Sequence, residues 1–119
     1  MTDVTLAQRS VMVVEDNPPL RELLGAMLSA LGYTACEARS GEEAIAMLRQ
    51  GIQISMLITD IQMPGGMTGI ELAEVVREEF SAIKVVLMSG LDEPLNLPAQ
   101  ISYLPKPFTA KILQSVVQS

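Results

Sequence analysis

MLITD, at residues 56–60, decides the fold, because it is an apolar run of strand length that ends at a carboxylate. The next seven residues include Pro64, Gly65 and Gly66, which suit neither a strand nor a helix. Asp60 is therefore predicted at the carboxyl end of a buried strand, facing a loop. In open parallel α/β sheets, ligands bind at that edge. Other polar side chains that reach the same edge would make it a site.

The composition indicates one globular domain with an aliphatic core. The chain has 119 residues, of which 49% are hydrophobic, and its net charge of −6 offers no basic surface for nucleic acid. Its single cysteine, Cys36, permits no internal disulfide, and the absence of histidine excludes Ser-His-Asp and Cys-His catalysis. No apolar run approaches the ~20 residues of a membrane span, and residues 1–10 lack a signal-peptide core. We therefore expect a soluble, cytoplasmic protein with neither nucleic-acid nor membrane partners.

Strand-like and helix-like patterns alternate along the whole chain. Short apolar runs predict strands at residues 11–14, 33–38, 56–59, 84–88 and 101–104. The stretches between them and after the last one carry helical periodicity, except that residues 89–100 give a weak signal. Alternating strands and helices with right-handed crossovers predict a parallel sheet that is covered by helices on both faces.

Polar and glycine residues mark the ends of the predicted helices. Asn17 and Thr109 are predicted N-caps, and Ser40 with Glu43 predicts a capping box. Gly32 and Gly51 would end the first two helices, and the third starts near Gly69. The apolar residues that recur every three or four positions should face the core, and they include Leu23, Ile70 and Ile112.

Five polar residues follow or end four of the predicted strands: Glu15, Asp16, Asp60, Ser89 and Lys106. If those strands are parallel neighbours, the five side chains meet at one edge. Carboxylates ~4 Å apart repel each other by roughly 1–4 kcal/mol, which a hard divalent cation such as Mg²⁺ would relieve. A lysine and a hydroxyl beside them supply the parts that hold a phosphoryl group in transfer to a carboxylate. Asp60 should be that nucleophile, because it lies on the central strand.

These motifs resemble the response-regulator receiver domains of two-component signalling. The matching stretches are VMVVEDN, LITDIQMPGGMTG, VVLMSG and YLPKPF, which stand in the family's order from Val11 to the last helix. The resemblance implies a flavodoxin-like, doubly wound α/β fold with a five-stranded parallel sheet in the order 2-1-3-4-5. It also implies a receiver domain at residues 11–119 after a flexible lead-in at residues 1–10.

The resemblance implies a role for each matched residue, with Mg²⁺ as the cofactor and Mn²⁺ as a substitute. Asp60 would be the phosphoacceptor, and Lys106 would be the ion partner of the phosphoryl group. Asp16 and Asp60 would bind the metal directly, Glu15 would bind it through water, and the backbone carbonyl of Gln62 would be a further ligand. The Ser89 hydroxyl would turn toward the phosphoryl group, and Tyr103 would be an aromatic switch.

The segment between Ser89 and Lys106 departs from the family pattern. It is shorter than in most receivers and contains Pro94 and Pro98, each of which costs ~3 kcal/mol inside a helix. We expect the helix between the fourth and fifth strands to be short or missing, and residues 91–100 to be among the most mobile before phosphorylation. We also expect a cis peptide bond before Pro107, in the turn that aims the lysine at the site.

The resemblance implies a phosphorylation-dependent switch rather than an enzyme that turns over an outside substrate. A histidine kinase or a histidine phosphotransfer protein would donate the phosphoryl group, and the chain would catalyse only its own phosphorylation and dephosphorylation. Since no effector domain follows Ser119, output would pass to a downstream protein partner, from either a stand-alone receiver or one of a hybrid kinase.

Two alternatives remain open from the sequence. A pseudo-receiver would bind partners without phosphorylation, although all five site residues are retained. A phosphatase with an aspartate nucleophile would need a second acid two residues after Asp60, where Gln62 stands, and an insertion to cover its substrate.

Overall fold

One parallel sheet organises the computed structural model, which describes residues 9–90 and 100–118. The strand order β2-β1-β3-β4-β5 confirms the predicted fold class. The strands are β1 (Ser10–Val14), β2 (Thr34–Ala38), β3 (Met56–Asp60), β4 (Lys84–Ser89) and β5 (Ile101–Pro105). The helices in the described part are α2 (Pro18–Ala30), α3 (Gly41–Arg49), α4 (Gly69–Glu79) and α5 (Ala110–Val117).

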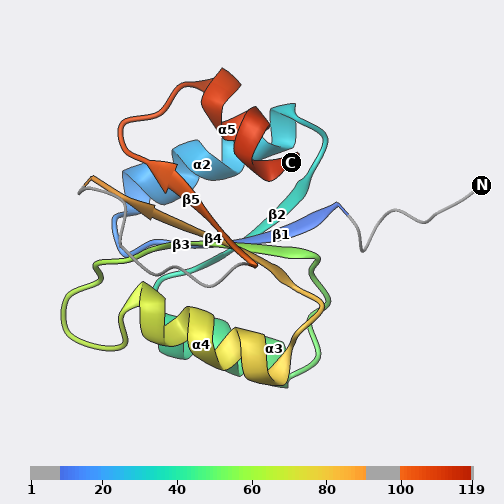
Figure 1. Cartoon of the computed structure of the whole chain (residues 1–119), viewed down its shortest axis with the longest axis vertical. Coiled ribbons are helices and arrows are strands. Elements are labelled where there is room, and N and C mark those ends of the chain that lie inside the picture. Colours follow the sequence, from blue (N-terminus) through green and yellow to red (C-terminus); the bar gives the residue numbers. More distant parts are fainter. Residues whose placement is uncertain (1–8, 91–99, 119) are drawn as a thin grey trace, which may run out of the picture.

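The helices cover the sheet in two layers, with α2 and α5 on one face and α3 and α4 on the other (Figure 1). Side chains alternate along each strand, so that Met12 and Leu57 pack toward α3 and α4, whereas Val13 and Ile58 pack toward α2 and α5. Every residue of β3 is buried, which explains why this central strand is an unbroken apolar run until it reaches the edge.

The predicted caps form, with one change of partner. Asn17 and Thr109 accept hydrogen bonds from the backbone N–H groups three residues later, both at 3.1 Å. Ser40 accepts from the Glu43 N–H, but the Glu43 carboxylate accepts from the N–H of Arg39 (2.7 Å) rather than from that of Ser40. The predicted capping box is therefore only half formed.

The start of α4 has the complete capping box that was predicted for α3. The Thr68 hydroxyl accepts from the Glu71 N–H, and the Glu71 carboxylate accepts from the Thr68 N–H. Gly32 and Gly51, just after α2 and α3, have the positive φ angles expected of glycines that end helices.

Three apolar residues that we expected in the core are exposed. Leu23, Ile70 and Ile112 are 54%, 40% and 42% exposed, so these predictions were wrong. Consecutive helical residues lie about 100° apart, and each of the three stands outside the narrow stripe that meets the sheet. That stripe is occupied instead by Leu24 and Leu28 on α2, Leu72, Ala73 and Val76 on α4, and Leu113 and Val117 on α5.

Several predictions fall on residues 1–8 and 91–99, which lie outside the described part of the chain. They include most of the lead-in, the effect of Pro94 and Pro98, and the helix between β4 and β5. Among the described helices, none combines the length and the apolar character that crossing a membrane requires.

Candidate functional site

The five predicted site residues lie together at the carboxyl edge of the sheet. Asp60 and Ser89 are the last residues of β3 and β4, while Glu15 follows β1 and Lys106 follows β5 directly. The parallel register places Asp60 beside Met88 and Ser89 beside Pro105, so the strand ends are level. The sheet therefore brings together side chains that are up to 91 positions apart in sequence, from Glu15 to Lys106.

Lys106 forms the central ion pair of this edge. Its Nζ lies 2.9 Å from Asp60 Oδ2 and 3.6 Å from Glu15 Oε1. Its backbone N–H donates to the carbonyl oxygen of Ser89 (2.9 Å), which ties the lysine to the end of β4. The peptide bond before Pro107 is cis, which confirms that prediction.

Three carboxylates crowd around this ammonium group. One carboxylate oxygen each from Glu15, Asp16 and Asp60 lies within 4.8 Å of the others. Glu15 and Asp60 are buried, whereas Asp16 is exposed to solvent. Glu15 Oε2 accepts from the Asn17 N–H (3.1 Å), but Oε1 has no hydrogen-bond partner, the one such buried side-chain atom found in the described residues.

Burial raises the pKa of the Glu15 carboxyl group to about 7. The hydrogen bond from the Asn17 N–H lowers this pKa, the neighbouring carboxyls of Asp16 and Asp60 raise it, and Lys106 lowers it. One ammonium group thus faces three carboxylates, and the negative charge is only partly balanced. Hard oxygen donors with excess negative charge, one of them a buried oxygen without a hydrogen-bond partner, fit a divalent cation such as Mg²⁺.

The remaining predicted residues lie beside this cluster. The Gln62 N–H points toward Asp60 Oδ1 (3.4 Å), so Gln62 is within reach of the site. Ser89 is buried, and its carbonyl also accepts from the half-buried Tyr103 hydroxyl (3.4 Å). The structure brings all the predicted residues to this edge, although their roles stay predictions.

Sequence reasoning missed three residues that shape the site. A Cβ on Gly69 would overlap the carbonyl oxygen of Asp60, so this glycine allows α4 to start against the end of β3. Glu42 on α3 accepts from the Met67 N–H (3.0 Å) and holds the loop after Asp60. Arg21 donates to the Glu15 carbonyl oxygen. None of these contacts has a signal in the local sequence, because each joins separate segments.

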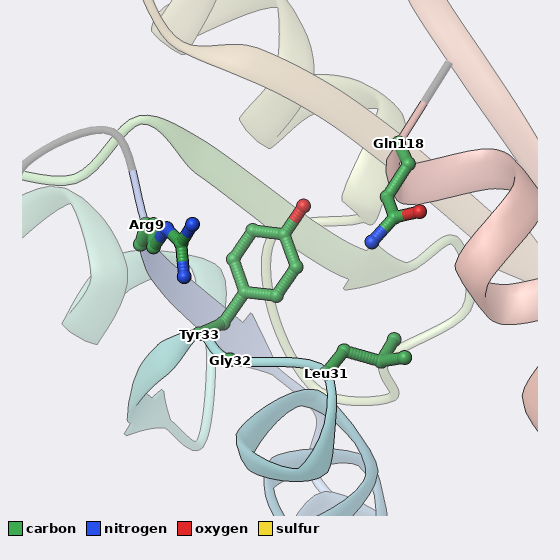
Figure 2. A pocket seen from close by; sticks show the side chains of 5 residues that line it. All are labelled: Arg9, Leu31, Gly32, Tyr33 and Gln118. Carbon is green, nitrogen blue, oxygen red and sulfur yellow. The ribbon is translucent and has the colours of Figure 1, made fainter. Parts of the chain in front are cut away.

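A largely apolar groove of about 540 Å³ opens beside the cluster. Lys106 lines it, together with Leu20, Leu23, Met27, Gly90, Pro107 and Phe108. A second hollow, of about 270 Å³, lies where β1 and β2 begin; Arg9, Tyr33 and Gln118 surround it in Figure 2. Of these two hollows, only the first is lined by Lys106, which pairs with Asp60 and Glu15, so it is the one relevant to the site.

Comparison with known proteins places this geometry in a family. The response regulator receiver domain family matches residues 11–118. The chemotaxis protein CheY of Pseudomonas aeruginosa is 33% identical over 116 residues, which cover 91% of this chain and 92% of CheY. The sensor kinase CckA of Brucella abortus is 35% identical over 115 residues, which cover 92% of this chain but 12% of the kinase.

A solved structure extends the similarity to three dimensions. TrrA from Thermotoga maritima, in complex with Mg²⁺ and BeF, has a TM-score of 0.82 and 30% identity over 93% of this chain and 97% of TrrA. The family match covers nearly the whole chain, and the strand order agrees with the fold expected of this family. The chain therefore belongs to the response-regulator receiver domains of two-component signalling.

Proposed function

We propose that Asp60 accepts a phosphoryl group in a Mg²⁺-dependent reaction and that the phosphorylated domain signals through protein contacts. The observation that carries this proposal is the ion pair between Lys106 Nζ and Asp60 Oδ2 (2.9 Å) inside a cluster of three carboxylates. Asp60 presents a carboxylate nucleophile at the ligand-binding edge of the sheet, and Lys106 presents the positive charge that an incoming phosphoryl group requires.

The donor is a phosphohistidine outside this domain, since residues 1–119 contain no histidine. An Asp60 carboxylate oxygen attacks the phosphorus atom, a P–O bond forms, and the P–N bond to the donor imidazole breaks. The bonding pair stays on the imidazole nitrogen, which takes up a proton. Asp60 becomes an acyl phosphate, and the Lys106 ammonium group balances charge on the phosphoryl oxygens.

Glu15, Asp16 and Asp60 would hold the Mg²⁺ ion, with the Gln62 carbonyl as a further ligand and Mn²⁺ as a substitute. When bound, the ion supplies positive charge that stabilises the phosphoryl oxygens during transfer. Glu15 Oε1, which is buried and lacks a hydrogen-bond partner, and the carboxylate spacing support this assignment. The TrrA complex with Mg²⁺ and BeF supports it from a relative of the same fold.

The switch would run through Ser89 and Tyr103. Phosphorylation would draw the Ser89 hydroxyl toward the phosphoryl group, and Tyr103 would change rotamer with it. The Tyr103 hydroxyl already points to the Ser89 carbonyl at 3.4 Å, so the two residues are neighbours before any change. A downstream protein partner would recognise the changed surface.

The groove beside Lys106 is the approach for the phosphodonor protein, a histidine kinase or a histidine phosphotransfer protein. Leu23 is 54% exposed on its rim, where an apolar contact could seat a partner next to Asp60. Leu23→Arg should slow transfer from a protein donor about tenfold and leave transfer from a small acyl phosphate unchanged. Ile112→Arg is the matched control, because Ile112 is similarly exposed but does not line the groove. Equal slowing by both variants would remove the groove from the proposal.

The alternatives have weaker support. Receiver domains are generally signalling modules rather than enzymes, and Gln62 stands where a phosphatase of this kind needs a second acid. The pseudo-receiver differs from our proposal by one result, which is whether the protein takes up a phosphoryl group.

Phosphotransfer from a panel of purified, radiolabelled histidine kinases tests the proposal. The wild type should take up one base-labile phosphoryl group, and chelation of Mg²⁺ should abolish uptake. Asp60→Asn should fold and take up none, because its amide is isosteric but not nucleophilic. Label retained on Asp60→Asn would refute the assignment, and no uptake by the wild type from any donor would favour the pseudo-receiver.

A further inference from the structure

Arg21 is a nearly buried cation at the end of the first turn of α2, with contacts to two separate strand ends. Its Nη1 donates to the carbonyl oxygen of Glu15 (2.8 Å), just after β1. Its Nε donates to Glu37 Oε1 (3.2 Å), on the neighbouring strand β2. The Arg21 side chain is only 12% exposed, so it is held in place rather than free in solvent.

Helix stability does not explain a cation at this position. The amino end of a helix carries a partial positive charge, which disfavours a nearby guanidinium group. The first turn of α2 holds no acidic residue that would offset this repulsion. The contacts of Arg21 outside its own helix must therefore account for its place.

The contact with Glu15 fixes one particular peptide group. The Glu15 carbonyl belongs to the peptide that joins Glu15 to Asp16, and its direction sets where Asp16 leaves the strand. The Glu15 N–H donates to the Ala38 carbonyl (3.1 Å), and the Glu15 carboxylate accepts from the Asn17 N–H. Arg21 adds a charge-assisted hydrogen bond to the Glu15 carbonyl oxygen.

Glu37 in turn orients the guanidinium group. A lysine at position 21 has one ammonium group and no planar fork, so it could not reproduce the two contacts with the same geometry. A chain of contacts thus runs from β2 through Arg21 to the peptide that carries Asp16. Asp16 is the exposed member of the carboxylate cluster and has the least packing of its own to hold it.

We propose that Arg21 is a positioning residue for the cation site, acting through the Glu15–Asp16 peptide and held by Glu37. It touches neither the ion nor the phosphoryl group. This inference rests on the proposed Mg²⁺ site. Removal of a group that orients a metal ligand typically weakens metal binding by about 10-fold to 100-fold.

A Mg²⁺ titration followed by amide chemical shifts tests the role of Arg21. Arg21→Ala should weaken Mg²⁺ binding at least tenfold, and Glu37→Gln should weaken it by a smaller factor. Arg21→Lys should recover part of the affinity. The matched control is Arg49→Ala, because Arg49 also pairs with a glutamate, Glu79 (2.6 Å), but is exposed and joins α3 to α4. This control should bind Mg²⁺ as the wild type does.

A second readout does not depend on the metal. In metal-free protein, Arg21→Ala should speed amide hydrogen exchange at Asn17, whose N–H is held by the Glu15 carboxylate. If Arg21→Ala does not fold, Arg21→Lys and Glu37→Gln carry the measurement, since each alters only part of the contact chain.

The two proposals fail in different ways. Wild-type Mg²⁺ affinity in Arg21→Ala, with the wild type itself binding Mg²⁺, would overturn only the positioning role. Unchanged wild-type spectra at millimolar Mg²⁺ would overturn the metal site and the positioning role together. Weaker binding in Arg49→Ala equal to that in Arg21→Ala would show a general loss of stability and would also overturn the positioning role.

Discussion

Lys84 and Lys106 lie at opposite ends of the same sheet and have opposite kinds of partner. Lys84 begins β4, and its Nζ donates to the carbonyl oxygens of Val116 (3.0 Å) and Val117 (3.4 Å) in the last turn of α5. Lys106 follows β5 and pairs with the carboxylates of Asp60 and Glu15. Burial lowers the pKa of Lys84.

The two lysines mark two different ends of the sheet. Lys84 lies at the end that contacts α5, and Lys106 lies at the end that carries the candidate site. The negative end of a helix dipole favours a cation, so Lys84 stabilises the carboxyl end of α5. At the other end, three carboxylates share one ammonium group, and burial raises the pKa of Glu15 to about 7. A carboxyl group with a strongly raised pKa at a ligand-binding edge is typical of functional sites.

The largest expected effect tests how tightly the functional end is packed. In Gly69→Ala the new Cβ would overlap the Asp60 carbonyl oxygen, which is backbone and cannot move aside without shifting β3 or α4. We expect a loss of about 3 kcal/mol or more, at the upper end of overpacking costs. Urea denaturation measures it. Gly90→Ala is the control, because a Cβ there meets nothing within 4 Å among residues 9–90 and 100–118, and equal losses in both variants would contradict the packing argument.

The next prediction concerns the free energy of unfolding that the protein loses when Glu15 ionises in the carboxylate cluster. Between pH 4.5 and about 7 the folded protein keeps a proton on Glu15 that the unfolded chain has released. The metal-free wild type should therefore lose stability as the pH rises through this window, by about 3 kcal/mol in total. Glu15→Gln stays neutral and should escape this loss.

Urea denaturation in a chelating buffer at several pH values checks this prediction. At pH 8 Glu15→Gln should be the more stable protein, whereas below pH 4.5 both side chains are neutral and the two stabilities should converge. Millimolar Mg²⁺ should restore the wild type at pH 8 and help the variant less. Parallel stability curves for the two proteins would show that Glu15 ionises normally in the folded state.

The smallest effect sharpens the contrast between the two lysines. Lys84→Ala should cost about 1–2 kcal/mol, because it removes the hydrogen bonds from Nζ to two carbonyl groups of α5 and an apolar stem. The Mg²⁺ affinity of Lys84→Ala should match that of the wild type.

Lys106→Ala should bind Mg²⁺ at least as tightly as the wild type, since the ammonium group of Lys106 in the wild type competes for the same carboxylates. The variant should nevertheless lose the link between phosphorylation and shape change. A weakened Mg²⁺ site in Lys84→Ala would show that the two ends are coupled.

Local patterns predicted the parallel sheet and the five polar residues at its carboxyl edge, whereas the strand order and the roles of Gln62 and Tyr103 came from the family resemblance. Apolar runs that stop at polar residues located the strand ends, and the alternation of strands and helices implied a parallel sheet. Asn17, Thr109, Gly32 and Gly51 act as predicted, because caps and helix-ending turns depend on residues only a few positions apart. Parallel strands share one carboxyl edge, so Asp60 and Lys106 could be placed together without knowledge of any distance.

Tertiary structure alone decided the polar contacts and the raised pKa at that edge, and which residues beside the buried stripe of each helix are exposed. Three features depend on contacts between segments from different elements. They are the burial that raises the pKa of Glu15, the contact of Lys84 with α5, and the contact of Arg21 with the Glu15 carbonyl. The exposure of Leu23 likewise depends on how α2 rolls on the sheet. Periodicity specifies which residues share a face of a helix, whereas packing against the rest of the chain specifies how much of that face is covered and which polar group meets which partner.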